Sequence, residues 1–301
     1  MRIVFMGTPD FAVPTLERII SDGHEVLAVV TQPDKPQNRG MKLTYSPVKE
    51  CALKYDIPVL QPVKIKKDEE FIKMYKELAP DVAVVVAFGQ ILSKEILDVP
   101  KYGCINVHGS LLPKYRGAAP IQWSIINGDK VTGITTMYMD VGLDTGDMIL
   151  KDEVEIGEEE TAGELYDRLS NVGAETLSKT LKLIEEGNVP REKQGEEFSY
   201  APMLTRETGI IDWNKKSSEI KSLVNGTSPW PGAITILNGK KIKVHKVKIA
   251  SGSGVPGTIL KSDDKEGLIV ASFDGAIELI EIQPENKKRM IAKDYLRGNK
   301  I

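Results

Sequence analysis

Cysteine is scarce in this 301-residue sequence, which contains only Cys51 and Cys104. Two thiols cannot form the disulfide framework of a small secreted protein, and they are too few for a cysteine-rich zinc site. No apolar run approaches the roughly 20 residues that cross a bilayer as a helix. The first residues, MRIVFMGTPD, also lack the charged, apolar and small-residue phases of a signal peptide. We therefore expect a cytoplasmic protein with no membrane association and no metal.

Neither hydrophobic residues, at 41%, nor charged residues, at 28%, are in excess, as is typical of a soluble globular protein. The chain is longer than most single domains, so two domains are expected. Residues 1–206 hold 24 Lys and Arg against 32 Asp and Glu, a net −8, whereas residues 207–301 hold 16 against 11, a net +5. A basic tail on an acidic body fits an anionic partner such as nucleic acid, and it also fits an uneven, solvated surface.

The first part of the chain alternates short apolar runs with helical patterns. The Ser46-Pro47 pair predicts a helix start with serine at the N-cap, and Thr161 to Glu164 predicts a capping box that opens a long helix. Strands that alternate with helices predict an α/β fold with a doubly wound, mostly parallel sheet. The expected strands are Ile3–Met6, Glu25–Val30, Val82–Ala87 and Cys104–Val107.

The pattern changes near residue 188. Residues 188–206 are polar, contain two prolines and show neither period clearly, so we predict a linker. Beyond it, Asn238-Gly239 lies between two strand patterns and is a strong hairpin signal. Short strands with a helix near Ser217–Val224 predict a small closed or partly closed antiparallel β-barrel, OB-like in form. The strands expected there are Ala233–Leu237, Lys241–Ala250, Gly257–Leu260, Leu268–Ser272 and Ala276–Ile282.

The resulting domain prediction is a first domain at 1–188, a linker at 189–206 and a basic β-barrel at 207–301. At the first strand-to-helix turn, Gly7 to Asp10, backbone amides could hold an anion, or the turn could serve without any ligand. The dinucleotide fingerprint GxGxxG is missing because position 9 is proline, which disfavours a nicotinamide enzyme.

Asn106 and His108 lie two residues apart at the end of a predicted strand, so their side chains project from the same face. Ligands of open parallel sheets collect at the carboxyl ends of the strands. An amide and an imidazole placed there can bind a carbonyl oxygen and relay a proton, although the same residues can simply end a strand.

Two carboxylates, Asp140 and Asp144, follow in a segment dense in turn residues, Met139 to Gly146. One of them could orient His108, because an aspartate beside a histidine fixes the tautomer and stabilises the imidazolium. Carboxylates in glycine-rich loops also form turns, so the pattern alone leaves both roles open.

The segments Asn106-Val-His108-Gly-Ser-Leu-Leu-Pro113 and Asp140-Val-Gly-Leu-Asp-Thr-Gly146 together resemble the signature of the 10-formyltetrahydrofolate formyltransferase superfamily. The resemblance implies a formyltransferase-type, Rossmann-like first domain and 10-formyltetrahydrofolate as the formyl donor. It implies that Asn106, His108 and Asp144 are the catalytic residues. The folate-contacting residues that it implies are Phe88, Gly89, Ile91, Ser110, Leu111, Leu112, Pro113, Asp140 and Val141.

Three further features resemble the branch of the superfamily that formylates methionyl initiator tRNA: the Gly7–Ala12 turn, the long Thr31–Lys49 segment and the separate basic β domain. In that branch the long loop meets the acceptor end of the tRNA, so the resemblance assigns Lys35, Arg39 and Lys42 to tRNA binding. Cationic side chains on a loop suit phosphate contacts. We expect a monomer.

Two other readings remain. One is formyl transfer to a small amine such as glycinamide ribonucleotide or an amino sugar, which would need neither the long loop nor the basic domain. The other is a non-catalytic RNA-binding protein that reuses the fold, against which the complete Asn, His and Asp set argues.

Some positions depart from the family pattern. Met203 and Ile210 stand where many relatives carry a lysine and an arginine, which leaves tRNA contacts there in doubt. Trp123 replaces a residue that is often polar, and we interpret it as a packing residue or a species variation. Trp213 and Trp230 could stack on bases, but large aromatics in a small barrel are expected in its core.

Overall fold

The computed structural model describes residues 1–37 and 42–301. Their contacts divide the chain into two compact units. Unit 1 contains Met1–Gly117, Gly133–Val154 and Tyr166–Tyr200, and unit 2 contains Ala118–Thr132, Glu155–Leu165 and Ala201–Ile301. Two segments that precede residue 166 therefore belong with the C-terminal part of the chain.

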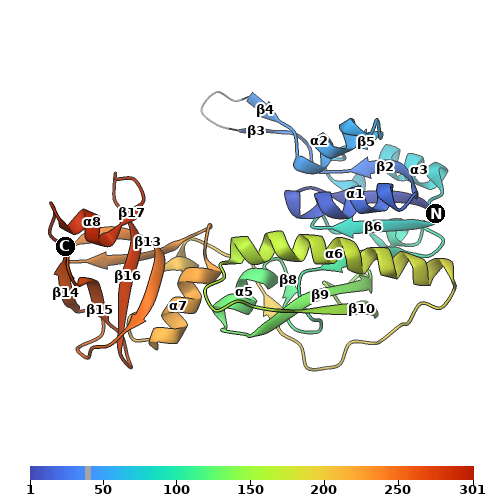
Figure 1. Ribbon diagram of the computed structural model, residues 1–301. Coiled ribbons are helices and arrows are strands. Elements are labelled where there is room, and N and C mark those ends of the chain that lie inside the picture. Colours follow the sequence, from blue (N-terminus) through green and yellow to red (C-terminus); the bar gives the residue numbers. More distant parts are fainter. Residues whose placement is uncertain (38–41) are drawn as a thin grey trace. The chain divides into compact units, whose positions relative to one another are not determined.

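Seven strands of the described residues form the sheet of unit 1, in the order β10-β9-β7-β6-β1-β2-β5 (Figure 1). The strands from β7 to β5 run parallel, whereas β9 pairs antiparallel with β7. The α/β fold with a mostly parallel sheet is thus confirmed. The strands are β1 (Arg2–Gly7), β2 (Glu25–Val30), β5 (Val59–Leu60), β6 (Val82–Val86), β7 (Cys104–His108), β9 (Val131–Tyr138) and β10 (Met148–Glu155).

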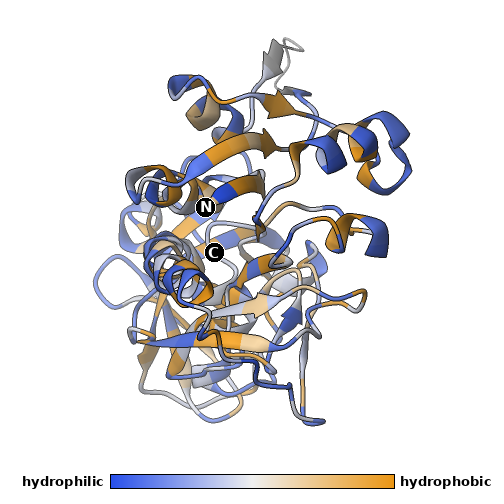
Figure 2. Cartoon of the chain, turned by 90° about the vertical axis from the view of Figure 1, so that its right-hand side faces the viewer, coloured by the Kyte–Doolittle hydropathy of each residue, from blue (hydrophilic) through white to orange (hydrophobic). Residues whose placement is uncertain are grey.

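Burial explains why these segments form strands. Every residue of β6, Val-Ala-Val-Val-Val, is buried, as a parallel strand covered on both faces requires. Figure 2 shows orange, hydrophobic runs on strands of the sheet, while the helices carry both colours. Strand β6 ends at Val86 rather than at the predicted Ala87, because Ala87 has a left-handed backbone with φ of 46°.

The helices that precede residue 186 are α1 (Val13–Ser21), α2 (Pro47–Lys54), α3 (Glu69–Leu78), α4 (Lys94–Leu97), α5 (Pro120–Ile126) and α6 (Ala162–Glu185). Both predicted helix starts are confirmed. Ser46 Oγ accepts a hydrogen bond from Lys49 N at 3.1 Å. Thr161 N donates to Glu164 Oε2 at 2.9 Å while Glu164 N donates to Thr161 Oγ1 at 3.3 Å, so the capping box is complete.

Six strands in the described part of the chain form the sheet of unit 2, in the order β12-β13-β16-β15-β14 with β17 beside β16. Every pairing in it is antiparallel, so the sheet builds a small barrel-like domain. Its strands are β12 (Ala233–Leu237), β13 (Lys240–Ala250), β14 (Ile259–Asp263), β15 (Gly267–Ala271), β16 (Ala276–Pro284) and β17 (Met290–Ile291).

Turn chemistry sets the register of this sheet. Asn238 and Gly239 both have positive φ, 45° and 75°, as a two-residue hairpin turn between β12 and β13 requires. The strand predicted at Gly257–Leu260 begins later, at Ile259, because Gly257 has φ of +85° and cannot be extended. Helices α7 (Ser217–Gly226) and α8 (Ala292–Leu296) also belong to unit 2.

Helix α5 packs against α7 within unit 2. A Cβ on Gly226 would lie 2.5 Å from Ile126 Cγ1, so only glycine allows this close approach. The remaining short elements are η1 (Asp10–Ala12), β3 (Lys35–Gln37), β4 (Lys42–Thr44), η2 (Ile65–Lys67), β8 (Arg116–Gly117), β11 (Tyr200–Ala201) and η3 (Glu207–Gly209).

Candidate functional site

The two faces of β7 are covered differently. A Cβ on Gly173 of α6 would lie 3.0 Å from Val107 Cγ1, so the Val107 side chain faces that helix. Because side chains alternate along a strand, Asn106 and His108 face the opposite side of the sheet. His108 is buried with 6% of its surface exposed, and Asn106 is half-buried. The two residues singled out by their spacing therefore share one face, as predicted.

His108 has a fixed orientation. Its Nε2 lies 2.9 Å from the carbonyl oxygen of Tyr115. A carbonyl oxygen only accepts hydrogen bonds, so Nε2 carries a proton and donates it to Tyr115. In the neutral ring Nδ1 is then the atom that can take up a proton. That nitrogen lies 3.8 Å from Asp144 Oδ2.

Asp144 is held by the backbone as well as by its neighbours. Its Oδ2 accepts a hydrogen bond from Gly117 N at 2.8 Å. The 3.8 Å between this oxygen and His108 Nδ1 exceeds the usual length of an N–H···O hydrogen bond, so the two groups can form an ion pair without a direct hydrogen bond. Asp144 itself has φ of 52°, in the left-handed region that few non-glycine residues adopt.

The segment that carries Asp144 to His108 begins near the amino end of β7, which the sequence did not predict. Because β9 is antiparallel to β7, Tyr138 lies beside Ile105, and Met139 N bonds to Cys104 O at 2.8 Å. The segment 140–146 therefore leaves the sheet near the amino end of β7, and Asp144 returns over its face. Gly146 allows the return, since a Cβ there would lie 1.8 Å from Tyr138 O.

Asn106 is available for a ligand. Its strand neighbours are Val85 of β6 and Met137 of β9. Within residues 1–37 and 42–301 its side-chain amide has no hydrogen-bond partner. A half-buried amide with free donors can stabilise a negatively charged oxygen placed over the face of β7.

Thr135 of β9 holds the predicted folate segment Ser110–Pro113 in place through two hydrogen bonds. Thr135 Oγ1 donates to Ser110 O at 2.7 Å and accepts from Leu112 N at 3.1 Å. Ser110 Oγ donates to Lys114 O at 2.7 Å, and Leu112 is 1% exposed. Thr135 was not among the predicted site residues, because a threonine within an apolar strand is common.

The other predicted folate residues lie in loops that follow β6 and β9. Phe88 is buried, and its carbonyl oxygen accepts hydrogen bonds from Thr8 Oγ1 at 3.0 Å and Gln32 Nε2 at 3.1 Å. Gly89 has φ of +82°, which suits glycine. Ile91 and Val141 are apolar yet 70% and 65% exposed, and the remaining residue of the set, Asp140, is exposed as well.

At the first strand-to-helix turn of unit 1, the polar groups form hydrogen bonds with one another. Phe11 N donates to Asp10 Oδ1 at 3.0 Å and lies 3.3 Å from Tyr166 Oη, while Tyr166 Oη donates to Asp10 Oδ1 at 2.7 Å. Burial, with the hydrogen bond to Asp10, raises the pKa of Tyr166. A cavity of about 420 Å³ adjoins this turn between α1, α2 and α6, and none of the predicted catalytic residues lines it.

Both ends of the predicted tRNA loop are anchored in unit 1. Thr31 Oγ1 and Ser46 Oγ are 2.8 Å apart, and Lys49 Nζ donates to Asp34 Oδ2 at 2.5 Å. This hydrogen bond lowers the pKa of Asp34. Lys35 is exposed.

The other two predicted tRNA residues cannot be placed in the same way. Lys42 begins β4, whose backbone pairs with β3. Arg39 lies outside the described residues.

The tryptophans differ from the prediction in one case. Trp213 packs against the core of unit 2 and donates from Nε1 to Thr235 Oγ1 at 2.9 Å. Trp230 is 56% exposed, so the expectation that it lies in the core is wrong. Trp123 Nε1 donates to Pro202 O at 2.8 Å, which agrees with a packing role. The departing residues Met203 and Ile210 are exposed.

Two further findings concern the described residues as a whole. They contain no group of three or more His, Cys, Asp or Glu residues that could hold a metal ion. No helix formed by them is both long and apolar enough to cross a membrane.

Sequence comparisons cover the full chain. Residues 1–181 match the family model described as formyl transferase, and residues 203–300 match that of the formyl transferase C-terminal domain. Methionyl-tRNA formyltransferase of Clostridioides difficile is 59% identical, with 100% of this chain and 98% of the relative aligned. The relative of the same name in Ruminiclostridium cellulolyticum is 56% identical, with 100% and 97% aligned.

Solved structures with the same fold are more distant in sequence. The sugar 3N-formyl transferase WlaRD superposes with a TM-score of 0.69 at 22% identity, over 96% of this chain and 99% of that one. HypX from Aquifex aeolicus, solved with tetrahydrofolic acid, gives 0.66 at 17% identity, over 98% of this chain and 47% of that one. At these identities the likeness concerns the fold alone. The sequence matches decide the family: this chain belongs to the formyl transferases, in the group of the methionyl-tRNA formyltransferases.

Proposed function

We propose that this chain transfers the formyl group of 10-formyltetrahydrofolate to the α-amino group of methionyl initiator tRNA. The observation that carries the proposal is the arrangement over the face of β7, where a free amide, an oriented imidazole and a carboxylate converge from Asn106, His108 and Asp144. The family membership agrees with this chemistry.

The acceptor needs little activation. A free α-amine has a pKa of about 8, and the neighbouring ester of an aminoacyl-tRNA should lower it further. A usable fraction is neutral near pH 7, so the amine can attack the formyl carbon directly. The formyl oxygen then becomes an oxyanion, and the bond to the folate nitrogen breaks once that nitrogen takes up a proton.

Asn106 and His108 stabilise the developing charge. The side-chain amide of Asn106 donates to the oxyanion, and the protonated His108 ring lies on the same face of β7. Since Nε2 of His108 is committed to Tyr115 O at 2.9 Å, the proton that the ring gains or loses is the one on Nδ1. Asp144 Oδ2, at 3.8 Å from Nδ1, stabilises the imidazolium and relays the amine proton toward the leaving nitrogen.

The residues around the site fit a folate. The donor supplies an activated formyl group on nitrogen, so no metal is needed for the transfer. We propose that the exposed apolar side chains of Ile91 and Val141 flank the pterin ring, together with Phe88 and Gly89. The segment Ser110–Pro113, which Thr135 fixes in place, would contact the rest of the folate along with Asp140.

Two regions of the chain would bind the tRNA. Lys35, Arg39 and Lys42 on the loop that leaves unit 1 can pair with phosphates of the acceptor end, and the basic residues 207–301 can follow the backbone. We accordingly propose a catalytic domain at 1–188, a linker at 189–206 and a tRNA-binding domain at 207–301. We also infer that the protein works in the cytoplasm as a monomer.

The direct test is a transfer assay with purified protein and 10-formyltetrahydrofolate. The expected result is formylation of methionyl initiator tRNA, with little transfer to glycinamide ribonucleotide or to a sugar amine. Transfer to a small amine alone would overturn the tRNA assignment, and tRNA binding without turnover would favour a non-catalytic RNA-binding protein.

Substitution is a better test of the tRNA contacts than truncation. Deletion of residues 207–301 would remove α7, and with it the packing partner of α5 in unit 2. Arg39→Ala should instead raise the KM for tRNA while leaving folate binding unchanged. A normal KM for tRNA in this variant would remove the loop from the proposed interface.

A further inference from the structure

The segment Arg191–Tyr200, predicted as part of a linker, is fastened to the loops of the site, and we call it the strap. Near its start, Glu192 exchanges two backbone hydrogen bonds with Met148 of β10, at 2.8 and 2.9 Å. Near its end, Ser199 Oγ accepts from Tyr115 N at 2.9 Å and Ser199 O accepts from Arg116 N at 2.8 Å. The strap therefore joins the segment that follows β7 to the start of β10.

Between these two attachments, the side chain of Gln194 connects the same loops. Its Nε2 donates to Asp144 O at 2.8 Å and to Gly146 O at 2.9 Å. Its Oε1 accepts from Arg116 Nε at 2.9 Å. Both amide hydrogens and the amide oxygen are thus in use, and only a primary amide can make this set of contacts.

The two carbonyl groups belong to a backbone that needs support. Asp144 has φ of 52°, which costs an L-residue about 1 kcal/mol or more. Left-handed residues persist where their surroundings hold them, and two hydrogen bonds from Gln194 supply such a restraint on either side of Thr145.

Arg116 carries the restraint to the opposite loop. It is buried, with 7% of its surface exposed, and its guanidinium lies 4.4 Å from the centre of the Phe198 ring. The next residue is Gly117, whose N–H holds the Asp144 carboxylate at 2.8 Å. Gln194 thereby fixes Asp144 twice, through its backbone and through the loop that binds its side chain.

We propose that Gln194 is a positioning residue for formyl transfer, which sets the place of the Asp144 carboxylate relative to His108. The inference rests on the catalytic role proposed for Asp144. Gln194 touches no substrate in this scheme, and its influence passes entirely through the 144–146 backbone and Arg116.

Two variants of Gln194 test the proposal. Gln194→Glu keeps the acceptor for Arg116 but loses both donors, and it places a negative charge beside two carbonyl oxygens. Gln194→Met has similar length and no hydrogen bonds, and it remains informative if the charged variant fails to fold. Because a displacement of about 1 Å at a reacting group can cost 100-fold in rate, we expect kcat to fall roughly 10- to 100-fold, with both KM values within about 3-fold.

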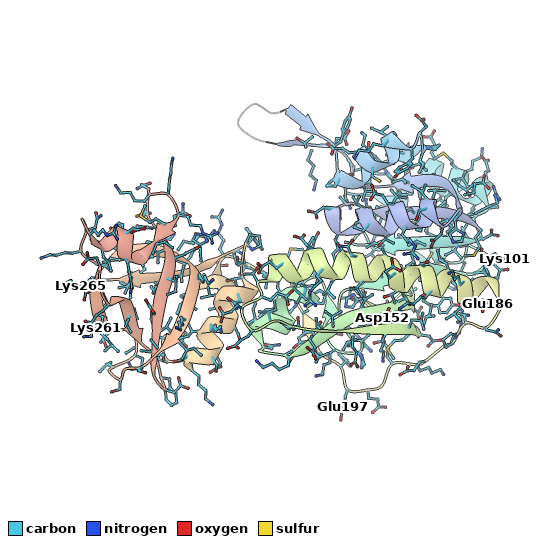
Figure 3. All side chains as sticks on the ribbon, in the orientation of Figure 1. Lys101, Asp152, Glu186, Glu197, Lys261 and Lys265 are labelled. Carbon is cyan, nitrogen blue, oxygen red and sulfur yellow. The ribbon has the colours of Figure 1, made fainter. Side chains whose placement is uncertain are left out.

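Glu197→Gln is the matched control. It is a change of the same size in the same strap, and Figure 3 shows Glu197 pointing away from the ribbon into solvent. This variant should keep the wild-type kcat. Thermal melting of all variants shows whether they are folded.

The deciding measurement is a double-mutant cycle with Asp144→Asn. If Gln194 acts through the Asp144 carboxylate, Gln194→Met should reduce kcat by no more than about 3-fold once that carboxylate is gone. An equal loss in both backgrounds would overturn the proposal, and so would a normal kcat or a change confined to KM in the single variant.

The same cycle separates this inference from the proposed function. Full activity of Asp144→Asn alone would remove the catalytic role of that carboxylate, and the positioning role of Gln194 with it. A slow Asp144→Asn beside a folded, fully active Gln194→Met would overturn only the inference about Gln194.

Discussion

The strands of the two sheets differ in how many of their residues are buried. In unit 1, β6 is buried at all of its residues, and on β7 only Asn106 is more than slightly exposed. In unit 2, β12 and β13 alternate between buried and more exposed residues, and β13 carries five lysines. Antiparallel strands can leave one face in water, whereas parallel strands are covered on both faces.

This contrast shows where each kind of polar group can be placed. On the buried parallel sheet, His108 bonds to the Tyr115 carbonyl in the loop after β7, whereas the half-buried amide of Asn106 is left for a ligand. A half-solvated sheet can carry many charges on its outer face without such partners. The buried parallel sheet suits chemistry on a small group. The half-solvated antiparallel sheet suits the binding of a long polyanion.

The largest effect is expected from the loss of one donor on the unit 1 sheet. Asn106→Ala should lower kcat about 100- to 1000-fold, because the oxyanion loses a preorganised hydrogen bond. Steady-state transfer assays with folate-binding titrations would measure it, and folate affinity should change little. Near-normal turnover would mean that Asn106 is not an oxyanion donor.

Core substitutions test whether the two units are separate in stability. Ile105→Ala in unit 1 and Ile242→Ala in unit 2 truncate fully buried side chains, and each should cost about 2–5 kcal/mol of unfolding free energy. The chain has three tryptophans, Trp123, Trp213 and Trp230, and all belong to unit 2. Tryptophan fluorescence therefore reports on unit 2, while loss of transfer activity in urea reports on unit 1.

We expect Ile242→Ala to shift the fluorescence transition more than the activity transition, and Ile105→Ala to do the reverse. Equal shifts of both transitions in both variants would show that the units unfold as one cooperative block.

A smaller effect is expected from the lysines on β13. Lys246→Ala combined with Lys248→Ala should raise the KM for tRNA about 10-fold and reduce its salt dependence by about one counterion per lost phosphate contact. The kcat should stay unchanged. Lys101→Ala, an exposed lysine of unit 1, is the control (Figure 3). An unaltered KM at every salt concentration would exclude these two lysines from the tRNA interface.

The smallest effect is expected at Asp34, where the predicted tRNA loop is anchored in unit 1. The hydrogen bond from Lys49 lowers the pKa of Asp34 below its ordinary value of 3.8. A carboxyl whose pKa is lower in the folded state stabilises the protein above the unfolded pKa, and this stabilisation is lost as the pH falls through the folded pKa. Asp34→Asn should therefore lower the melting temperature slightly at pH 6, and the difference should shrink as the pH falls below 3.8. A difference that stays constant as the pH falls would contradict the ion pair.

Much of the site could be read from residue spacing, because spacing within one strand fixes which side chains share a face. Asn106 and His108 are such a pair. The role of Asp144 followed from family resemblance. The path of the 140–146 segment back to His108 could not be predicted, because the antiparallel direction of β9 depends on long-range pairing. Gln194 was missed because its segment has no period, and its hydrogen bonds to Arg116, Asp144 and Gly146 join residues far away in sequence.

Sequence patterns were enough to predict the family, the caps of α2 and α6, the hairpin at Asn238-Gly239 and the apolar strands, because local backbone preferences and periodic burial act over a few residues. The folded chain was needed to show that Trp230 is exposed, that α5 belongs to unit 2 and that the strap bonds to the Asp144 loop. Each of these depends on which distant segments meet, and a local pattern carries no information about its eventual neighbours.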